Sequence, residues 1–254
     1  MATDLYIPDP HATYGVSNKR FEKLGKLILD RKPDNIICAG DWAEMESLSS
    51  YDKGKKVFEG KRYVHDIEAA VEAQELTFAP LNAYNAQKRK NKEKQYLPRK
   101  VMCLGNHDEG RTNKVLQLSP EYEGLISMDL LRYQDFWDDV VPFMKNITVN
   151  GILYSHYFPS GVMGNPFGSA RAMLNKLHMS CIAGHMHLLD IARQTRGDGK
   201  KLTAVIGGCF FEHTPYYASG TAHLWDRGLI MLNNVNDGEF DLEWISFDQL
   251  NGDY

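Results

Sequence analysis

The sequence predicts an α/β fold with a parallel sheet, and two observations support this prediction. A strand-like run at residues 5–8, a helical pattern at 17–33 and a second apolar run at 35–39 follow one another along the chain. A strand, a helix and a strand at this spacing form a βαβ unit, whose two strands are parallel. The second run is almost wholly apolar, as expected for a strand that is buried on both faces.

The first helix has recognisable ends. We expect Ser17 to be its N-cap, because a serine hydroxyl accepts a hydrogen bond from a free N–H of the first turn. We expect the helix to end at Pro33, which cannot continue it. Its apolar residues recur with the helical period, at Phe21, Leu24, Leu27 and Ile28.

Residues 45–99 are expected to be a polar, basic, helical insertion within a single domain that spans residues 1–254. Val64, Ile67 and Val71 indicate a helix with one apolar stripe, which Leu81 and Tyr84 continue. Five basic residues fall in 53–62, and seven fall in 88–100 against the single acidic Glu93. The segment is therefore either a solvated face or a basic arm that contacts the phosphate backbone of a nucleic acid.

The second half of the chain alternates helices and strands. Residues 114–141 should be mostly helical, and Pro142 breaks their pattern. Asn150-Gly151 is a strong hairpin signal and should join two strands within 146–155. A loop rich in Gly and Pro follows at 159–168, and then a helix at 169–178. The remaining predicted strands lie at 180–183, 189–194, 202–206, 222–234 and 240–246.

Five apolar, strand-like runs each end in residues that bind metals or transfer protons. The residues concerned are Asp9 and His11, Asp41, Asn106 with His107 and Asp108, His156, and His185 with His187. Oxygen and imidazole donors together suit Mn²⁺, Fe, Zn²⁺ or Ni²⁺ better than Ca²⁺ or Mg²⁺. The absence of cysteine from the set argues against a structural zinc site.

The number of donors indicates two ions. Seven candidate ligands exceed what one ion can take from protein while it keeps a position open. Two divalent ions that share a bridging carboxylate account for the excess. Asp41 is the natural bridge, since it is the lone acid directly after its strand.

The order of these motifs resembles the calcineurin-like metallophosphoesterase superfamily. The motifs are Asp-x-His, Gly-Asp, Gly-Asn-His-Asp, His and Gly-His-x-His. The stretch Ser47–Asp52 after Gly-Asp resembles the small phage and prophage members. The resemblance implies a four-layer α/β/β/α sandwich and the hydrolysis of phosphate esters by a metal-bridging hydroxide. The two divalent ions would be Mn²⁺ by preference, with Fe, Zn²⁺ or Ni²⁺ as alternatives.

The resemblance also implies a role for each motif residue. One ion would be held by Asp9, His11 and His187 with Asp41. The other would be held by Asn106, His156 and His185, again with Asp41. His107 would lie beside the phosphate and protonate the leaving oxygen, and Asp108 would orient the His107 ring by a hydrogen bond.

Two departures argue against a protein phosphatase. The protein Ser/Thr phosphatases of this superfamily continue Gly-Asp with Val-Asp-Arg-Gly, whereas this chain has Trp42-Ala43-Glu44-Met45. They also have Glu at the position of Asp108. Glu44 stands where many members have Asp, and we expect it either to bind an outer water or to face solvent.

Residues around the motifs are candidates for substrate binding. Arg111, three residues after Asp108, and His213, which follows the predicted strand at 202–206, are expected to bind substrate. Tyr157, Phe158 and Phe210 are placed either to stack on a base or simply to pack. We expect His65, His178 and His223 to be structural or surface residues.

The function predicted from these residues is that of a dinuclear phosphodiesterase or nuclease that acts on nucleic acid or nucleotides. Two alternatives stay open. One is a phosphomonoesterase that acts on a nucleotide or a small metabolite. The other is a non-catalytic binding protein on the same fold, against which the intact set of ligands argues.

Composition limits the setting in which this chemistry takes place. The net charge of −4 excludes a general polycation. The four cysteines lie in apolar runs without C-x-x-C spacing, which indicates reduced thiols in a cytosolic protein. We expect no signal peptide, no membrane span and a cytoplasmic location, in the host cytoplasm if the chain is phage-encoded.

Overall fold

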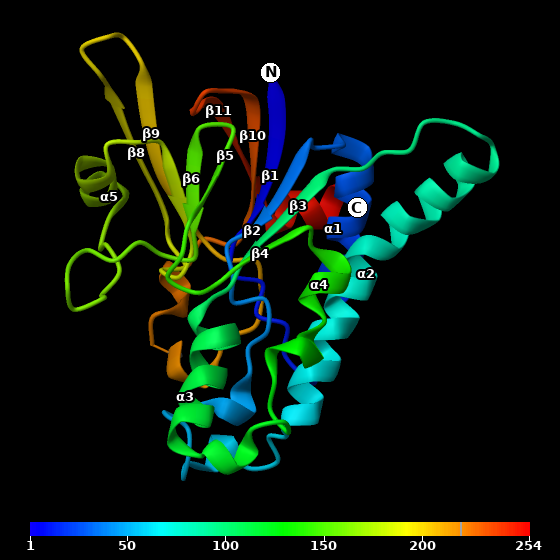
Figure 1. Cartoon of the computed structure of the whole chain (residues 1–254), viewed down its shortest axis with the longest axis vertical. Coiled ribbons are helices and arrows are strands. Elements are labelled where there is room, and N and C mark those ends of the chain that lie inside the picture. Colours follow the sequence, from blue (N-terminus) through cyan, green and yellow to red (C-terminus); the bar gives the residue numbers. More distant parts are fainter. Residues whose placement is uncertain (219) are drawn as a thin grey trace.

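The computed structural model describes residues 1–218 and 220–254, and two β-sheets packed face to face form its centre (Figure 1). The first sheet has the strand order β11-β10-β1-β2-β3-β4, and the second has the order β5-β6-β7-β9-β8. The strands of the first sheet are β1 (Ala2–Ile7), β2 (Asn35–Cys38), β3 (Arg99–Cys103), β4 (Asp139–Val141), β10 (Gly228–Asn236) and β11 (Glu239–Ser246). Those of the second are β5 (Ile147–Val149), β6 (Ile152–Ser155), β7 (Cys181–Ala183), β8 (Leu189–Thr195) and β9 (Lys201–Gly207).

Helices cover the outer face of each sheet. On the first sheet lie α1 (Lys19–Arg31), α2 (Tyr63–Lys90) and α6 (Phe247–Asp253), and on the second lies α5 (Ala170–Leu177). Of two shorter helices, α3 (Arg111–Leu118) follows the carboxyl end of β3, and α4 (Tyr133–Phe136) directly precedes β4. The predicted four-layer α/β/β/α sandwich is therefore confirmed.

Three apolar cores hold these layers together. Tyr6, Ile37 and Val205 are fully buried between the two sheets, where side chains of both inner faces meet. Phe21 and Leu24 are buried between the first sheet and its helices. The predicted βαβ unit is present, because β1 and β2 are parallel and α1 connects them. The four cysteines are buried and free, as predicted.

Helix α2 is a single element of 28 residues that continues through Pro80. Its predicted apolar stripe was wrong at Val64, which is 55% exposed. The helix instead turns small buried residues, Ala69, Ala70 and Ala73, toward the core. A Cβ atom on Gly25 of α1 would lie 2.5 Å from the carbonyl oxygen of Thr77, so α1 and α2 pack backbone to backbone. One face of this helix therefore belongs to the core and is not solvated.

Several predicted boundaries and elements differ from the structure. The cap of α1 is Asn18 and not Ser17. Residues 114–141 are mostly helical, as predicted, but in short pieces: α3 ends at Leu118, and 3₁₀ turns and α4 follow it. Strand β4, which pairs with β3 at the end of this segment, was not predicted. Strand β10 begins at Gly228, after a 3₁₀ turn within the predicted strand 222–234, and α6 was not predicted. The hairpin at Asn150-Gly151 and the helix capped by Ser169 are as predicted.

None of the helices in the described part of the chain is long and apolar enough to cross a membrane.

Candidate metal centre

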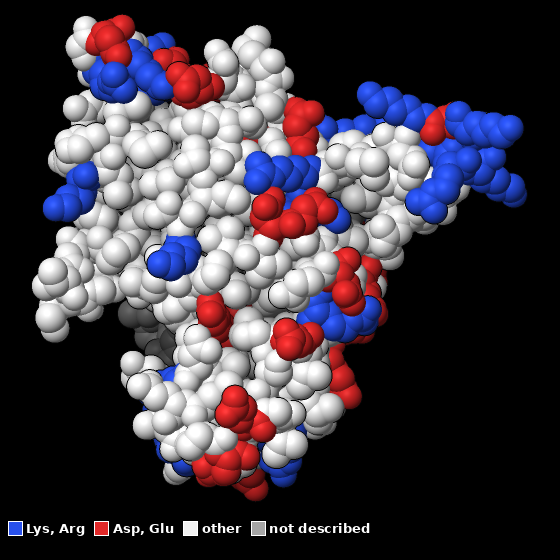
Figure 2. Space-filling model, in the orientation of Figure 1, with Lys and Arg blue, Asp and Glu red and all other residues white. Residues whose placement is uncertain are grey.

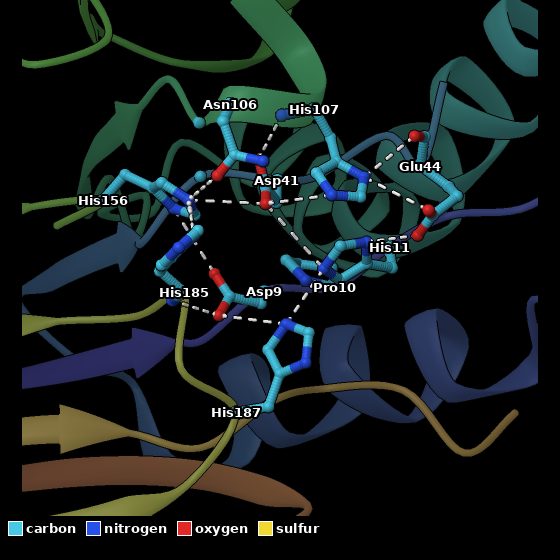
Figure 3. Close-up of polar contacts among 12 residues, drawn as sticks. Asp9, Pro10, His11, Asp41, Glu44, Asn106, His107, His156, His185 and His187 are labelled. Carbon is cyan, nitrogen blue, oxygen red and sulfur yellow. Dashed lines mark hydrogen bonds and ion pairs between the residues drawn. The ribbon is translucent and has the colours of Figure 1, made fainter. Parts of the chain in front are cut away.

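Polar residues converge where strands of both sheets end. Asp9, Asp41 and Asn106 follow β1, β2 and β3, whose parallel order brings their carboxyl ends to one edge of the sheet. His156 follows β6, and His185 and His187 follow β7 in the facing sheet. All seven predicted ligands meet in one cluster (Figure 3). Most of them are buried, and only Asn106 and His185 are half-buried.

One group of donor atoms surrounds the ring of His156. Its Nε2 atom lies 2.8 Å from Asn106 Oδ1, 3.2 Å from His185 Nδ1 and 3.3 Å from Asp41 Oδ2. Ligand atoms about 2.1 Å from one ion lie about 3.0 Å apart in octahedral geometry and about 3.4 Å apart in tetrahedral geometry. The spacing of these four residues therefore suits a single ion.

A second group surrounds the ring of His187. Its Nε2 atom lies 3.3 Å from His11 Nε2 and 3.6 Å from Asp9 Oδ2. His11 Nε2 is also 3.9 Å from Asp41 Oδ2, the oxygen that faces His156. Asp41 thus borders both groups, as expected of a bridging carboxylate.

The protonation states of the histidines fit metal binding. Burial lowers the pKa of His156 to about 4 and also lowers the pKa of His185 and His187, so these rings are neutral at pH 7 and their lone pairs are available. His156 Nδ1 lies 2.9 Å from the Ala39 carbonyl oxygen, which fixes its proton there and leaves Nε2 as the donor to an ion.

An unsatisfied oxygen also points to a cation site. Asp9 is fully buried, and its Oδ1 atom has no hydrogen-bond partner among the described residues. A buried carboxylate oxygen without a partner is costly. In this structure burial and the nearby Asp41 carboxylate raise the pKa of Asp9 well above its usual value. Two divalent ions would relieve both conditions, so the residues present fit the predicted dinuclear centre.

The backbone is strained where the ligands attach. Asp9, His11, Asp41, His185 and His187 all have positive φ values, between 34° and 71°. This left-handed region costs a residue with a Cβ atom about 1 kcal/mol or more. Because five such residues occur at one site, their backbone conformation is determined by the placement of their side chains in the cluster and not by local backbone preference.

Two glycines allow the carboxylates to approach. A Cβ atom on Gly105 would lie 2.0 Å from Asp41 Oδ1, and one on Gly184 would lie 2.5 Å from Asp9 Oδ1. Both distances are far below van der Waals contact. The glycines of the Gly-Asn-His-Asp and Gly-His-x-His motifs therefore make room for metal ligands that belong to other strands.

Glu44 lies at one side of the polar network, buried beside His11 and His107, which corrects the alternative that it faces solvent. It is only 3% exposed, and its carboxylate contacts Nδ1 of both His11 and His107, the latter at 3.2 Å (Figure 3). Despite its burial, these histidines hold the pKa of Glu44 well below its usual value. The three side chains also have donor atoms within 4.8 Å of one another. Their Nδ1 contacts with Glu44 identify this group as a hydrogen-bonded support for the metal ligands.

The contact predicted between Asp108 and His107 is made by Glu44 instead. The Asp108 carboxylate accepts hydrogen bonds from the backbone N–H groups of Trp42, Ala43 and Gly105 and from the Tyr133 hydroxyl, at 2.7–3.2 Å. Asp108 therefore fixes the loop that carries Asp41. The sequence alone did not single out Tyr133, because α4 approaches only through the tertiary fold.

His107 lies at the mouth of a cavity of about 340 Å³ together with Arg111. Burial disfavours the charged ring, but Asp41 and Glu44 outweigh burial and raise the pKa of His107. Arg111 Nη2 is 3.2 Å from His107 Nε2, and Arg111 Nη1 donates to the Glu44 carbonyl oxygen at 2.7 Å. Both residues thus border the space in front of the predicted metal ligands.

Of the other residues predicted to bind substrate or stack on a base, only Tyr157 lines the cavity at His107 in the described part of the chain. His213 does not line this cavity in the described part of the chain, and its ring lies 3.4 Å from Thr13 Oγ1, behind His11. Burial lowers the pKa of His213 to about 4. Its role in substrate binding stays a prediction. Tyr157 lines the cavity, whereas Phe158 and Phe210 are packed in the apolar cores.

Comparison with known proteins decides the family. The profile of calcineurin-like phosphoesterases matches residues 5–198, which include every predicted metal ligand. The chain belongs to this family. A search of curated proteins found no match.

Solved structures that resemble this chain over nearly its whole length include two of low sequence identity. YfcE, a phosphoesterase from E. coli, is 12% identical, with a TM-score of 0.40 over 95% of this chain and 98% of its own. The protein TT1561 of Thermus thermophilus is 10% identical, with a TM-score of 0.41 over 96% of this chain and 98% of its own.

Proposed function

We propose that this phosphoesterase is a dinuclear metal-dependent phosphodiesterase that acts on nucleic acid or nucleotides. One observation supports the dinuclear centre above all. Asp41 Oδ2 lies between two groups of donors, 3.3 Å from His156 Nε2 and 3.9 Å from His11 Nε2. Two divalent ions, with Mn²⁺ as our first choice, would activate a water for attack on phosphorus and neutralise charge on the phosphate.

His107 is proposed as the general acid. Glu44 contacts its Nδ1 atom and holds the ring, while Nε2 faces the cavity, 3.9 Å from Asp41 Oδ2. A phosphate oxygen accepts from a guanidinium more strongly than imidazole does, so bound substrate would take the Arg111 N–H from His107. His107 Nε2 would then hold a proton and deliver it to the leaving oxygen as the phosphorus–oxygen bond breaks.

A diester is favoured over a monoester by the surroundings of the cavity. A diester carries substituents on two sides of phosphorus, and this cavity adjoins a second hollow with which it shares the lining residues Leu48, Ser50 and Lys114. A site that accepts only a terminal phosphate has no need of such a neighbouring hollow. This adjacency supports a substrate that extends past the phosphate.

The test is a panel of substrates with Mn²⁺: bis(p-nitrophenyl) phosphate, p-nitrophenyl phosphate, cyclic nucleotides and single- and double-stranded DNA and RNA. We expect kcat/KM for the bis ester to exceed that for the mono ester by about tenfold or more, since a 1.4 kcal/mol difference in transition-state binding suffices. A preference for the monoester would establish the alternative phosphomonoesterase. Hydrolysis of no ester at all would overturn the proposal.

A further inference from the structure

A second hollow, of about 450 Å³, adjoins the cavity that His107 and Arg111 line. Its apolar lining comes from the segment after β2, the start of α2 and the region of α3: Phe58, Tyr63, Val115, Leu118, Tyr122 and Ile126. Leu118 is 71% exposed and Tyr122 is 44% exposed, although both are large apolar side chains. We call this hollow the side groove. It is of the size of typical ligand pockets and is unusually apolar for a surface.

The side groove also carries positive charges that have no carboxylate partner, although Lys114 donates a hydrogen bond to Ser50 and Arg62 donates one to the Lys61 carbonyl oxygen. Lys53, Arg62 and Lys114 line it, and within the described residues no carboxylate lies within 4 Å of their charged nitrogens. Lys61, also in the lining, differs because it forms an ion pair with Glu46. Cations without carboxylate partners beside an apolar surface suit a ligand that is both anionic and flat.

The other basic block of the chain is far from the metal centre. Lys88, Lys90 and Lys94 lie at or just beyond the distal end of α2, whose 28 residues span about 40 Å. Figure 2 shows this basic cluster at the upper right, away from the carboxyl ends of the strands. Of the two blocks noted in the sequence, only the one at 53–62 has members in the groove that adjoins the centre.

We propose that the side groove binds the unpaired nucleotide next to the scissile phosphate of a single-stranded nucleic acid. The inference rests on the phosphodiesterase activity proposed above and names its substrate class. Bases stack on exposed aromatic and apolar side chains such as Tyr122 and Leu118, and the adjoining phosphate pairs with Lys53 and Arg62. A duplex hides the faces of its bases, so an apolar groove cannot read them there.

The chemistry of the groove favours this occupant over a peptide. An acidic peptide would explain the cations, but it would not explain why the groove adjoins the cavity at His107, with Leu48, Ser50 and Lys114 in both linings. A polynucleotide explains both features, because its repeating phosphates lead from the metal centre into the groove.

The experiment compares two matched double variants. Lys53→Ala/Arg62→Ala removes two charges from the side groove, and Lys90→Ala/Lys94→Ala removes two from the distal end of α2. The measurement is kcat/KM on single-stranded oligothymidylate divided by kcat/KM on bis(p-nitrophenyl) phosphate, which has no second phosphate.

We expect this ratio to fall about tenfold in the groove variant and to change less than about twofold in the distal variant. The salt dependence of oligonucleotide cleavage should also flatten, by about 0.7 in logarithmic slope for each lost contact. On the apolar wall, Leu118→Glu should lower the ratio about fivefold or more, because it replaces an apolar contact with the base by a carboxylate that repels the phosphates. Leu125→Glu, outside the groove lining and 69% exposed, should not.

Several outcomes would overturn the inference while the proposed function stands. The first is an equal ratio of oligonucleotide to bis-ester kcat/KM in the groove and distal variants. The second is hydrolysis of the bis ester without cleavage of the oligonucleotide. The third is equal cleavage of duplex and single-stranded nucleic acid. Failure of the proposed function is recognised separately, since the wild type would then hydrolyse no ester with Mn²⁺. In that case anisotropy with a labelled oligonucleotide decides: binding lost only in the groove variant supports the groove, and binding unaffected in both variants removes it.

Discussion

Glu44→Gln should weaken the metal site without removing a metal ligand. The buried carboxylate of Glu44 contacts Nδ1 of His11, the ring whose Nε2 atom faces His187 and Asp41. An anionic acceptor at Nδ1 fixes the tautomer and makes Nε2 a better donor to a cation. Glutamine keeps the shape of the side chain but is neutral. Its amide has a single acceptor oxygen, whereas the carboxylate has two oxygens for the two histidines that it contacts.

The expected loss is about 10- to 100-fold in metal affinity, the usual effect of removing a partner of a ligating histidine. This corresponds to about 1.4–2.7 kcal/mol. Binding of the ion that Asp9, His11 and His187 would hold should be weakened, whereas binding of the ion that Asn106, His156 and His185 would hold should change less. Titration of the metal-free protein with Mn²⁺ by calorimetry, together with recovery of activity, would separate the two sites.

Glu46→Gln is the matched control for this experiment. Glu46 lies two residues further on, but its carboxylate pairs with Lys61 and contacts no predicted metal ligand. Both variants should keep the wild-type far-UV circular dichroism spectrum. If Glu44→Gln binds two Mn²⁺ ions with wild-type affinities, the carboxylate does not support His11 as a ligand and the reasoning fails.

Three further predictions concern the centre itself. Asp41→Asn should fold normally but lose bound metal and turnover, and two retained equivalents of metal with normal rates would remove Asp41 from the site. Gly105→Ala should abolish activity, because the new Cβ atom would lie 2.0 Å from Asp41 Oδ1. Gly168→Ala is the control, since open space surrounds that position. An active Gly105→Ala variant would contradict the packing argument. His107→Asn should keep both metals and lose about 10²–10⁴-fold on a nucleotide diester but clearly less on a p-nitrophenyl ester, whose leaving group needs little protonation; equal losses would mean that His107 acts only electrostatically.

The convergence of the candidate metal ligands could be predicted from sequence because their signal is local. Each apolar run is a strand, and the residue after it must appear at the carboxyl edge of a parallel sheet. Asp41 and His156 were recognised in this way, and their side chains meet at 3.3 Å. The same logic predicted the βαβ unit and the hairpin at Asn150-Gly151, since turn chemistry and hydrophobic period are short-range properties.

The support around the ligands could not be predicted because it depends on the tertiary fold. Glu44 points into the centre since the chain turns through left-handed conformations at Asp41 and Met45, with φ values of 48° and 50°. Tyr133 contacts Asp108 because the chain between α3 and α4 returns toward the carboxyl end of β3, a tertiary arrangement that no local pattern indicates. Strand β4 was missed for the same reason, because pairing with β3 and not local propensity makes it a strand.

The strained backbone at the candidate ligands and the polar contacts around them together indicate that contacts within the protein hold these side chains in position. Left-handed conformations at Asp9, Asp41 and His187 are unfavourable locally, so contacts elsewhere must impose them. The Asp108 carboxylate supplies such contacts, because it anchors the N–H groups of Trp42 and Ala43 directly after Asp41. A carboxylate that stands next to metal ligands in sequence can thus serve the backbone, whereas Glu44 serves the rings of His11 and His107. The position of a residue in a motif therefore indicates that it belongs to the site, but its contacts are needed to determine its role.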